Sequence, residues 1–277
     1  MLRMLTGGLR RVLSTAVLLS LATFASGQST VLEKVWTTSV SGEGLKEISA
    51  RVDRLVTEVG QHEYRSEVRK LRDLFKKTHA RFLHSYVRYT GIEQLTKGRY
   101  DCLTATSLFA DILAKSGYKY NIIETNYHIF IVVNTTGGDV VLETTDRFGG
   151  FIEDEKGKNE MIAEYKKNAL TWATPAHYQY NFSLYQPVSA DQLAGLLYFN
   201  QAVNAFNDRK WVECSDKLSA SSTTTSYVRV SQLAAMLYQS VEVSSTLEEE
   251  TKTAILNRWK GVALHSMPVA FHAKATK

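Results

Sequence analysis

Cys102, His128 and an acidic residue, Glu143 or Asp146, follow one another along one short segment of the chain. This order suits nucleophilic catalysis, in which a cysteine attacks, an imidazole moves the proton and a carboxylate orients the imidazole. Each residue also has a structural explanation. A lone cysteine is often a buried packing residue, a strand histidine is more often structural, and the acids can end a hairpin or cap a turn. The ordered combination favours a catalytic triad.

The elements that must position these residues follow from the local pattern. Residues 102–116 alternate apolar with small side chains, as buried helices do, with Asp101 as the predicted N-cap and Gly117 as the stop. Runs of β-branched and aromatic residues at 118–124, 128–134 and 140–145 predict an antiparallel meander with a glycine turn before its last strand. The sequence therefore predicts an α+β fold in which a Cys-bearing helix packs on an antiparallel sheet.

The predicted position of Cys102 has a chemical consequence. A thiol in the first turn of a helix lies among unpaired N–H groups at the positive end of the helix dipole. This position lowers the pKa of the thiol, so Cys102 is expected to supply a thiolate, and the same N–H groups are expected to hold a developing oxyanion. His128 opens the strand expected beside the helix, and Glu143 or Asp146 ends the next strand.

Three stretches resemble the core of the transglutaminase-like superfamily, whose papain-like fold carries a Cys-His-Asp triad. They are Gly98-Arg99-Tyr100-Asp101-Cys102, the strand 128–133 (HIFIVV), and Glu143-Thr144-Thr145. The resemblance implies a papain-like core with Cys102 as nucleophile and His128 as general acid and base. It places Glu143 where the family carries its aspartate, and Asp146, three residues later, is the alternative.

The same resemblance bears on the reaction. The tryptophan that usually follows the nucleophile in the family is Leu103 in this chain. Making an isopeptide bond requires that water be kept from the thioester, and the sequence identifies no site for an amine acceptor. Hydrolysis of an amide is therefore favoured over cross-linking.

The first 27 residues are predicted to be a signal peptide. A basic start with Arg3, Arg10 and Arg11 precedes an apolar run, and the small residues Ala25 and Gly27 predict cleavage before Gln28. The run is shorter than the ~20 residues of a membrane span, so no span is expected in the mature chain, which would be periplasmic or secreted. Loss of the three arginines lowers the formal net charge from +5 to +2. The basic composition therefore does not indicate a nucleic-acid partner.

Residues 28–187 are predicted to form the enzyme-like domain, which begins with two or three amphipathic helices. Apolar residues recur every three or four positions in this part, including Leu45, Ile48, Val52, Leu55, Val68, Leu71, Leu74, Phe82, Tyr86 and Tyr89. His79 and His84 are five residues apart and so face different sides of a helix. The sequence shows no metal-ligand cluster, and neither a metal nor another cofactor is predicted. The later loop residues Phe148, Phe151 and Ile152 are expected to line a substrate groove.

Residues 188–277 are predicted to form a separate helical region after a boundary near Pro187. One helix pair is similar to a tetratricopeptide unit, with Tyr198, Ala202 and Phe206 near its small and aromatic positions. Cys214 fits the amphipathic pattern as a packing residue, but a disulfide with Cys102 is the alternative in an exported chain. These helices are a candidate surface for a protein partner.

Two classes of function follow from these observations. The first is an exported cysteine hydrolase that acts on a peptide, a protein or another amide through Cys102, His128 and Glu143 or Asp146. The second is a non-catalytic binding or scaffold protein with the same fold, in which Cys102 is packed or disulfide-bonded. The sequence favours the first and does not identify the substrate or the oligomeric state.

Overall fold

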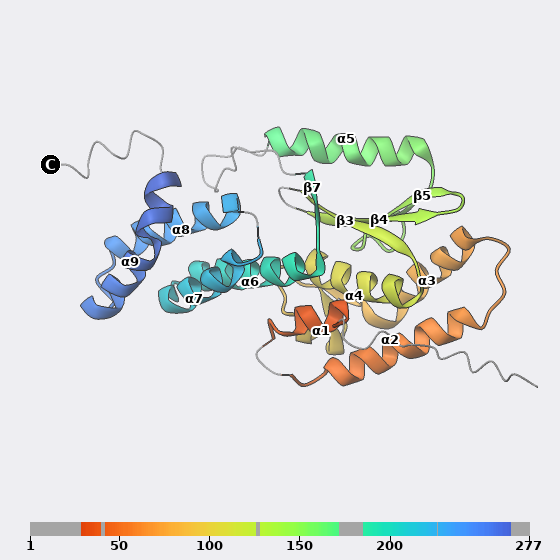
Figure 1. Cartoon of the computed structure of the whole chain (residues 1–277), viewed down its shortest axis with the longest axis horizontal. Coiled ribbons are helices and arrows are strands. Elements are labelled where there is room, and N and C mark those ends of the chain that lie inside the picture. Colours follow the sequence, from red (N-terminus) through yellow and green to blue (C-terminus); the bar gives the residue numbers. More distant parts are fainter. Residues whose placement is uncertain (1–28, 40–41, 126–127, 172–184, 226, 267–277) are drawn as a thin grey trace, which may run out of the picture.

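The computed structural model describes residues 29–39, 42–125, 128–171, 185–225 and 227–266. The predicted signal peptide lies outside the described residues. Within them the fold is α+β, with an antiparallel sheet of five strands and helices on both of its faces (Figure 1). No described helix is both long and apolar enough to cross a membrane.

The N-terminal part forms three helices, α1 (Val31–Trp36), α2 (Leu45–Gly60) and α3 (Glu67–Phe82). The predicted helical pattern was wrong beyond Phe82. Tyr86 belongs to a short strand, β1 (Ser85–Tyr86), which pairs in parallel with β2 (Arg99–Tyr100) after the 3-10 helix η1 (Ile92–Lys97). Tyr89 has a φ of 56°, which a continuing helix does not allow.

Helix α4 (Cys102–Lys115) begins and ends where the sequence predicts. Asp101 is its N-cap, and Gly117 lies just beyond it with a φ of +81°, a conformation that favours glycine. Its residues from Leu103 to Leu113 are all buried. The helix lies against the sheet on one side and against α1 and α2 on the other (Figure 1).

The predicted meander is confirmed as β3 (Lys119–Thr125), β4 (Ile129–Thr135) and β5 (Gly138–Leu142). The edge strands β6 (Phe151–Ile152) and β7 (Tyr185–Val188) complete the order β6-β5-β4-β3-β7. Because successive strand residues point to opposite faces, Ile122 and Ile131 join the core that contains α4. Ile123 and Phe130 face α5 (Glu155–Thr171) on the other side (Figure 1).

The C-terminal part consists of α6 (Ala190–Asn207), α7 (Trp211–Ser222), α8 (Tyr227–Glu242) and α9 (Glu249–Ser266). The predicted boundary near Pro187 falls inside β7, where Pro187 pairs with Ile123. Helix α6 is shared, because Leu193 belongs to the core around α4 and Ala202 to a second core among α6–α9. The sheet and the helical part are therefore continuous through α6.

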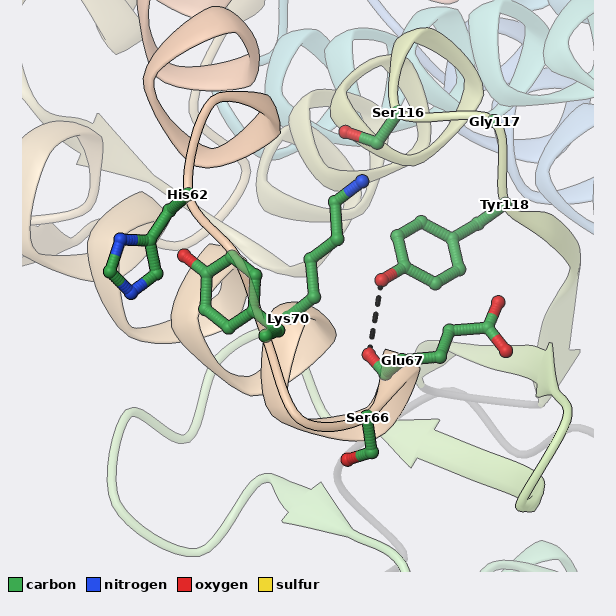
Figure 2. Close-up of a pocket in the computed structure, with 8 residues that line it drawn as sticks. His62, Ser66, Glu67, Lys70, Ser116, Gly117 and Tyr118 are labelled. Atoms are coloured by element: carbon green, nitrogen blue, oxygen red, sulfur yellow. Dashed lines mark hydrogen bonds between the residues drawn. The ribbon is translucent and has the colours of Figure 1, made fainter.

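A surface pocket of about 240 Å³ lies between the start of α3 and the end of α4 (Figure 2). Lys70, Ser116 and Tyr118 are among its lining residues, and the Tyr118 hydroxyl donates to the carbonyl oxygen of Glu67 at 3.2 Å. A helix rises ~1.5 Å per residue, so the length of α4 separates this pocket from Cys102. The pocket is not part of the predicted triad.

His79 of α3 is fully buried, whereas His84 is exposed, so the two do not share a site. The ring of His79 lies 4.6 Å from that of Phe75 and 5.5 Å from that of Phe109. Neither ring nitrogen has a hydrogen-bond partner among the described residues. Burial, followed by the charge of Arg147, lowers the pKa of His79 to about 4. His79 is therefore a neutral aromatic packing residue at pH 7.

We expect His79 to make the protein less stable in acid. The unfolded chain takes up a proton at this residue near pH 6.5, and the folded chain only near pH 4. The unfolded state therefore binds more protons between these values, and stability falls as the pH decreases through them, by about 3 kcal/mol in total. Urea denaturation of the wild type and His79→Phe at about pH 7.5 and about pH 4 measures this loss. An equal loss in the two proteins contradicts the assignment.

Candidate active site

Cys102 is the first residue of α4, and its neighbours fix the geometry of that turn. Asp101 Oδ1 accepts hydrogen bonds from the N–H of Thr104 at 2.8 Å and from its hydroxyl at 2.9 Å. The hydroxyl oxygen of Thr104 accepts from the N–H of Asp101 at 2.8 Å, which completes a capping box. Cys102 is thereby held at the N-terminal end of a buried helix, as the sequence predicts.

The environment of the thiol differs from the expectation of a thiolate. Burial, followed by the charges of Asp101 and Glu143, raises the pKa of Cys102 to about 12. The backbone N–H groups of Leu103 and Cys102 favour the thiolate but do not outweigh these effects. The helix terminus therefore faces a site that is too buried and too negative for it to ionise the sulfur. Cys102 is a neutral thiol at pH 7 in this structure.

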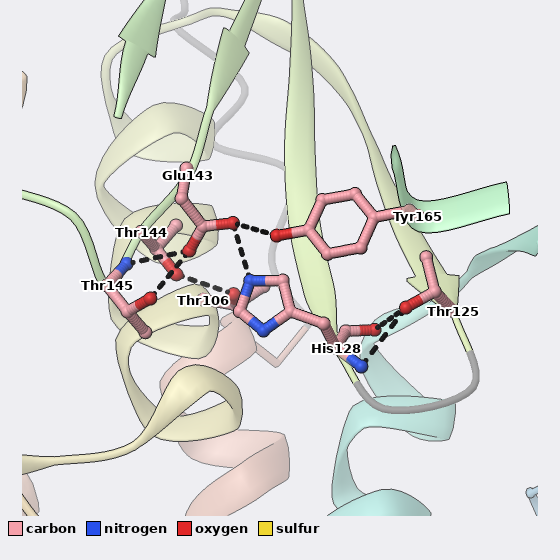
Figure 3. A network of polar contacts seen from close by, with 7 residues as sticks. All are labelled: Thr106, Thr125, His128, Glu143, Thr144, Thr145 and Tyr165. Carbon is pink, nitrogen blue, oxygen red and sulfur yellow. Dashed lines mark hydrogen bonds and ion pairs between the residues drawn. The ribbon is translucent and has the colours of Figure 1, made fainter. Parts of the chain in front are cut away.

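His128 is paired with Glu143, as Figure 3 shows. Its Nε2 lies 2.5 Å from Glu143 Oε2, and both side chains are largely buried. Oε1 of the same carboxylate accepts from Thr145, at 3.1 Å from the N–H and 2.6 Å from the hydroxyl. Burial raises the pKa of Glu143, but the hydrogen bonds from His128 and Thr145 outweigh it and the pKa lies below its ordinary value. Glu143 is therefore ionised, and Nε2 carries the proton that it accepts.

The pairing of Nε2 determines what the other ring nitrogen can do. Figure 3 shows Nδ1 of His128 on the side of the ring away from Glu143. With the proton on Nε2, Nδ1 is an acceptor. Within the described parts of the chain, no hydrogen bond joins Cys102 Sγ to His128. Catalytic contacts are often long in the absence of a ligand, so this does not exclude transfer of the thiol proton to Nδ1.

Two buried hydroxyls hold the cysteine helix against the end of β5. Thr106 Oγ1 of α4 lies 3.0 Å from Thr144 Oγ1, the residue after Glu143 (Figure 3). The contact sets α4 and Glu143 in fixed relation, and Glu143 is near enough to raise the pKa of Cys102. The nucleophile helix and the carboxylate thus belong to one packed unit.

Tyr165 of α5 completes the cluster, although the sequence did not single it out. Its ring stacks on that of His128, with centroids 5.2 Å apart and planes at 13°, and its hydroxyl donates to Glu143 Oε2 at 2.9 Å. Burial and the charge of Glu143 raise the pKa of Tyr165, so it stays a neutral donor. No spacing rule separates it from the other tyrosines.

Asp146, the alternative third member, lies elsewhere. It is exposed, and its Oδ1 accepts from the N–H groups of Phe148 at 2.9 Å and Gly149 at 3.0 Å. These bonds close the turn after β5, a common use of aspartate. The structure therefore brings His128 together with Glu143 and not with Asp146.

The predicted groove residues do not lie together. Phe148 is 93% exposed, whereas Phe151 packs against Phe75 of α3 with the Arg72 guanidinium 4.3 Å from its ring. Ile152 joins the core under α5. The three side chains have three different environments, so the expectation of a shared groove was wrong.

Both cysteines are free thiols, and Cys214 is buried in the second core, so the alternative disulfide is not formed. The described residues contain no group of His, Cys, Asp and Glu side chains suited to a metal ion. Comparison with protein-family models, with curated proteins and with solved structures finds no match. A function for Cys102, His128 and Glu143 therefore has to be inferred from their chemistry and from the resemblance of their motifs.

Proposed function

We propose that the protein is a cysteine hydrolase of the transglutaminase-like type that cleaves an amide bond in a peptide or protein. The observation that carries the proposal is the pair of His128 Nε2 and Glu143 Oε2 at 2.5 Å. It fixes the tautomer in which Nδ1 accepts a proton, beside a helix that begins with a cysteine. The carboxylate does for this histidine what the aspartate does in a catalytic triad.

The raised pKa of Cys102 decides the form of the first step. Because the thiol is neutral at rest, its proton moves to His128 Nδ1 as Sγ attacks the carbonyl carbon, and a C–S bond forms while the carbonyl becomes an oxyanion. The imidazolium is stabilised by Glu143 and returns the proton to the leaving nitrogen as the C–N bond breaks. Water activated by the same imidazole then hydrolyses the thioester and regenerates the thiol.

Two groups of donors support this chemistry. The N–H groups of Cys102 and Leu103 act on the sulfur at the start of α4 and are suited to hold the oxyanion. Tyr165 stacks on the imidazole and donates to the same carboxylate oxygen that binds Nε2. This stacking by Tyr165 limits rotation of the imidazole ring, so the ring keeps its orientation, with Nε2 bound to Glu143, when Nδ1 gains and loses a proton.

The remaining parts of the proposal come from the sequence. Residues 1–27 act as a signal peptide, so that the enzyme works in the periplasm or outside the cell. The core containing α4 and the sheet is of the papain-like, transglutaminase-like kind. The helices of 188–277 are tetratricopeptide-like and select a protein substrate or partner.

A second candidate function is that of a non-catalytic binding protein with the same fold. Two observations favour it: the pKa of Cys102 is raised to about 12, and no hydrogen bond joins its sulfur to His128 among the described residues. In this alternative the His128–Glu143 pair is a structural polar contact. Chemical reactivity of the thiol separates the two functions.

Hydrolysis is tested directly with a mixed peptide library and mass spectrometry of the products. We expect the wild type to cleave peptides and Cys102→Ala and His128→Ala to be at least about 100-fold slower. The matched control is Cys214→Ala, because Cys214 is fully buried in α7 and outside the cluster. Cleavage that persists in Cys102→Ala rules out Cys102 as the nucleophile.

Alkylation by iodoacetamide reports the state of Cys102. Since its pKa is raised to about 12, the rate in His128→Ala should rise about tenfold per pH unit from about pH 7 to pH 10, without a plateau. The rate in His128→Ala should be lower near neutral pH, because the imidazole no longer accepts the proton. Intact-protein mass spectrometry measures both rates. A plateau near pH 7 in His128→Ala would instead indicate a preformed thiolate, and equal rates in the two proteins near neutral pH would remove His128 from the mechanism.

The third member is tested by two matched changes of carboxylate to amide. Glu143→Gln should slow the His128-assisted alkylation of Cys102 near pH 7 by about tenfold or more, because the amide does not hold Nε2–H as a carboxylate does. This loss should exceed the gain from removing a charge that raises the pKa of the thiol, since that charge is a smaller cause of the raised pKa than burial. Asp146→Asn should leave the rate unchanged, since asparagine closes the same turn. A loss of reactivity in Asp146→Asn alone would reverse the assignment.

A further inference from the structure

Arg229 of α8 extends from the C-terminal helices to Glu124 and Thr125 at the end of β3. Its side chain is 11% exposed, and its Nε lies 2.8 Å from Oε1 of Glu124, whose side chain is 3% exposed. Its Nη2 donates to the carbonyl oxygen of Thr125 at 2.6 Å. One guanidinium therefore holds both a side chain and the last backbone carbonyl of β3.

Thr125 is in turn bonded to the backbone of His128. Its N–H donates to the carbonyl oxygen of His128 at 2.8 Å, and its hydroxyl oxygen accepts from the N–H of His128 at 3.1 Å (Figure 3). These bonds fix the point from which the imidazole side chain starts. Thr125 therefore links the guanidinium of Arg229 to the backbone of His128.

The surroundings of Arg229 come from several elements. Glu124 Oε2 also accepts from Gln186 Nε2 of β7 at 3.0 Å, and the guanidinium lies 6.0 Å from the ring centroid of Phe199 in α6. The planar fork of arginine suits two acceptors in different directions, which a lysine amine does not match. The contact joins α6 and α8 to β3 and β7.

We propose that Arg229 is a positioning residue for His128 and couples the C-terminal helices to the candidate active site. The inference rests on the proposed function, because the place of His128 matters chemically only if it moves the proton of Cys102. A displacement of about 1 Å in a catalytic group lowers rates by up to about 100-fold. The helical region in this view sets the geometry of the reaction, in addition to any role in binding a partner.

The variants must avoid leaving a buried charge unpaired. Arg229→Met combined with Glu124→Gln removes both charges together and so keeps the site neutral. Arg229→Lys keeps a positive charge for Glu124 but lacks the fork that reaches Thr125 as well. Arg258→Met is the matched control, because Arg258 of α9 forms a 2.7 Å ion pair with Asp216 of α7, within the same helical region.

Each variant is made in the wild type and in His128→Ala, and alkylation of Cys102 by iodoacetamide is measured in both. We expect the double variant to lower the rate about tenfold in the wild type and not at all in His128→Ala, since Arg229 acts through His128. Arg229→Lys should give an intermediate loss, and Arg258→Met none. When His128→Ala alone slows alkylation, an unchanged rate of the double variant in the wild-type background, or an equal loss in both backgrounds, overturns the proposal.

A second readout does not depend on reactivity. Nitrogen NMR of His128 should show the Nε2–H tautomer in the wild type and in Arg258→Met, and a mixture of tautomers in the double variant. A tautomer that is unchanged in the folded double variant overturns the role of Arg229. If His128→Ala itself leaves alkylation unchanged, the proposed function fails, and the tautomer then decides whether Arg229 positions His128.

Discussion

The burial of α4 is the constraint on which the rest of this structure depends. Every residue from Leu103 to Leu113 is buried, so the helix needs apolar partners all round. The sheet supplies one side, and α1, α2 and the start of α6 supply the others. Burying an apolar helix of this kind contributes about 25 cal/mol per Å² of surface removed from water. The same burial places the first residue, Cys102, in an environment where a charge is costly.

The chemistry of the site follows from that cost. A helix N-terminus favours an anion by about 0.3–1 kcal/mol at an exposed site. Two effects oppose the thiolate and prevail: its own burial, and the negative charges of Asp101 and Glu143. The proton therefore stays on sulfur at pH 7, and the proposed mechanism requires a base to remove it. A neutral imidazole held by an ionised Glu143 is suited to that task, because it gains a positive charge next to a negative one. In the proposed mechanism, the burial that prevents ionisation at rest would also strengthen this pairing when the proton moves.

The sequence predicted the parts of the fold that depend on local pattern. Helix α4 with its cap and stop, the meander β3–β5 and the contact of Glu143 with His128 follow from periodicity, turn residues and the resemblance of the motifs. Tyr165 was missed because its contacts depend on how α5 crosses the sheet, and no spacing along the chain encodes that crossing. Tyr86 and Phe151 were misjudged because an apolar residue fits a helix face, a strand or a groove equally well until its tertiary partners are known.

The direction of the pKa shift of Cys102 could not be predicted from the sequence either. A cysteine at a helix start has a lowered or a raised pKa according to which residues cover it. Arg229 is another case of this kind. The cost of placing a buried charge pair offsets much of its attraction, so Arg229 and Glu124 add little net stability compared with apolar residues, whereas breaking the pair costs about 3–5 kcal/mol. An apolar pair would fill the same space but could not bind the Thr125 carbonyl. Beyond its effect on stability, the ion pair orients the guanidinium so that it binds the Thr125 carbonyl at the end of β3. Thr125 in turn binds the backbone of His128.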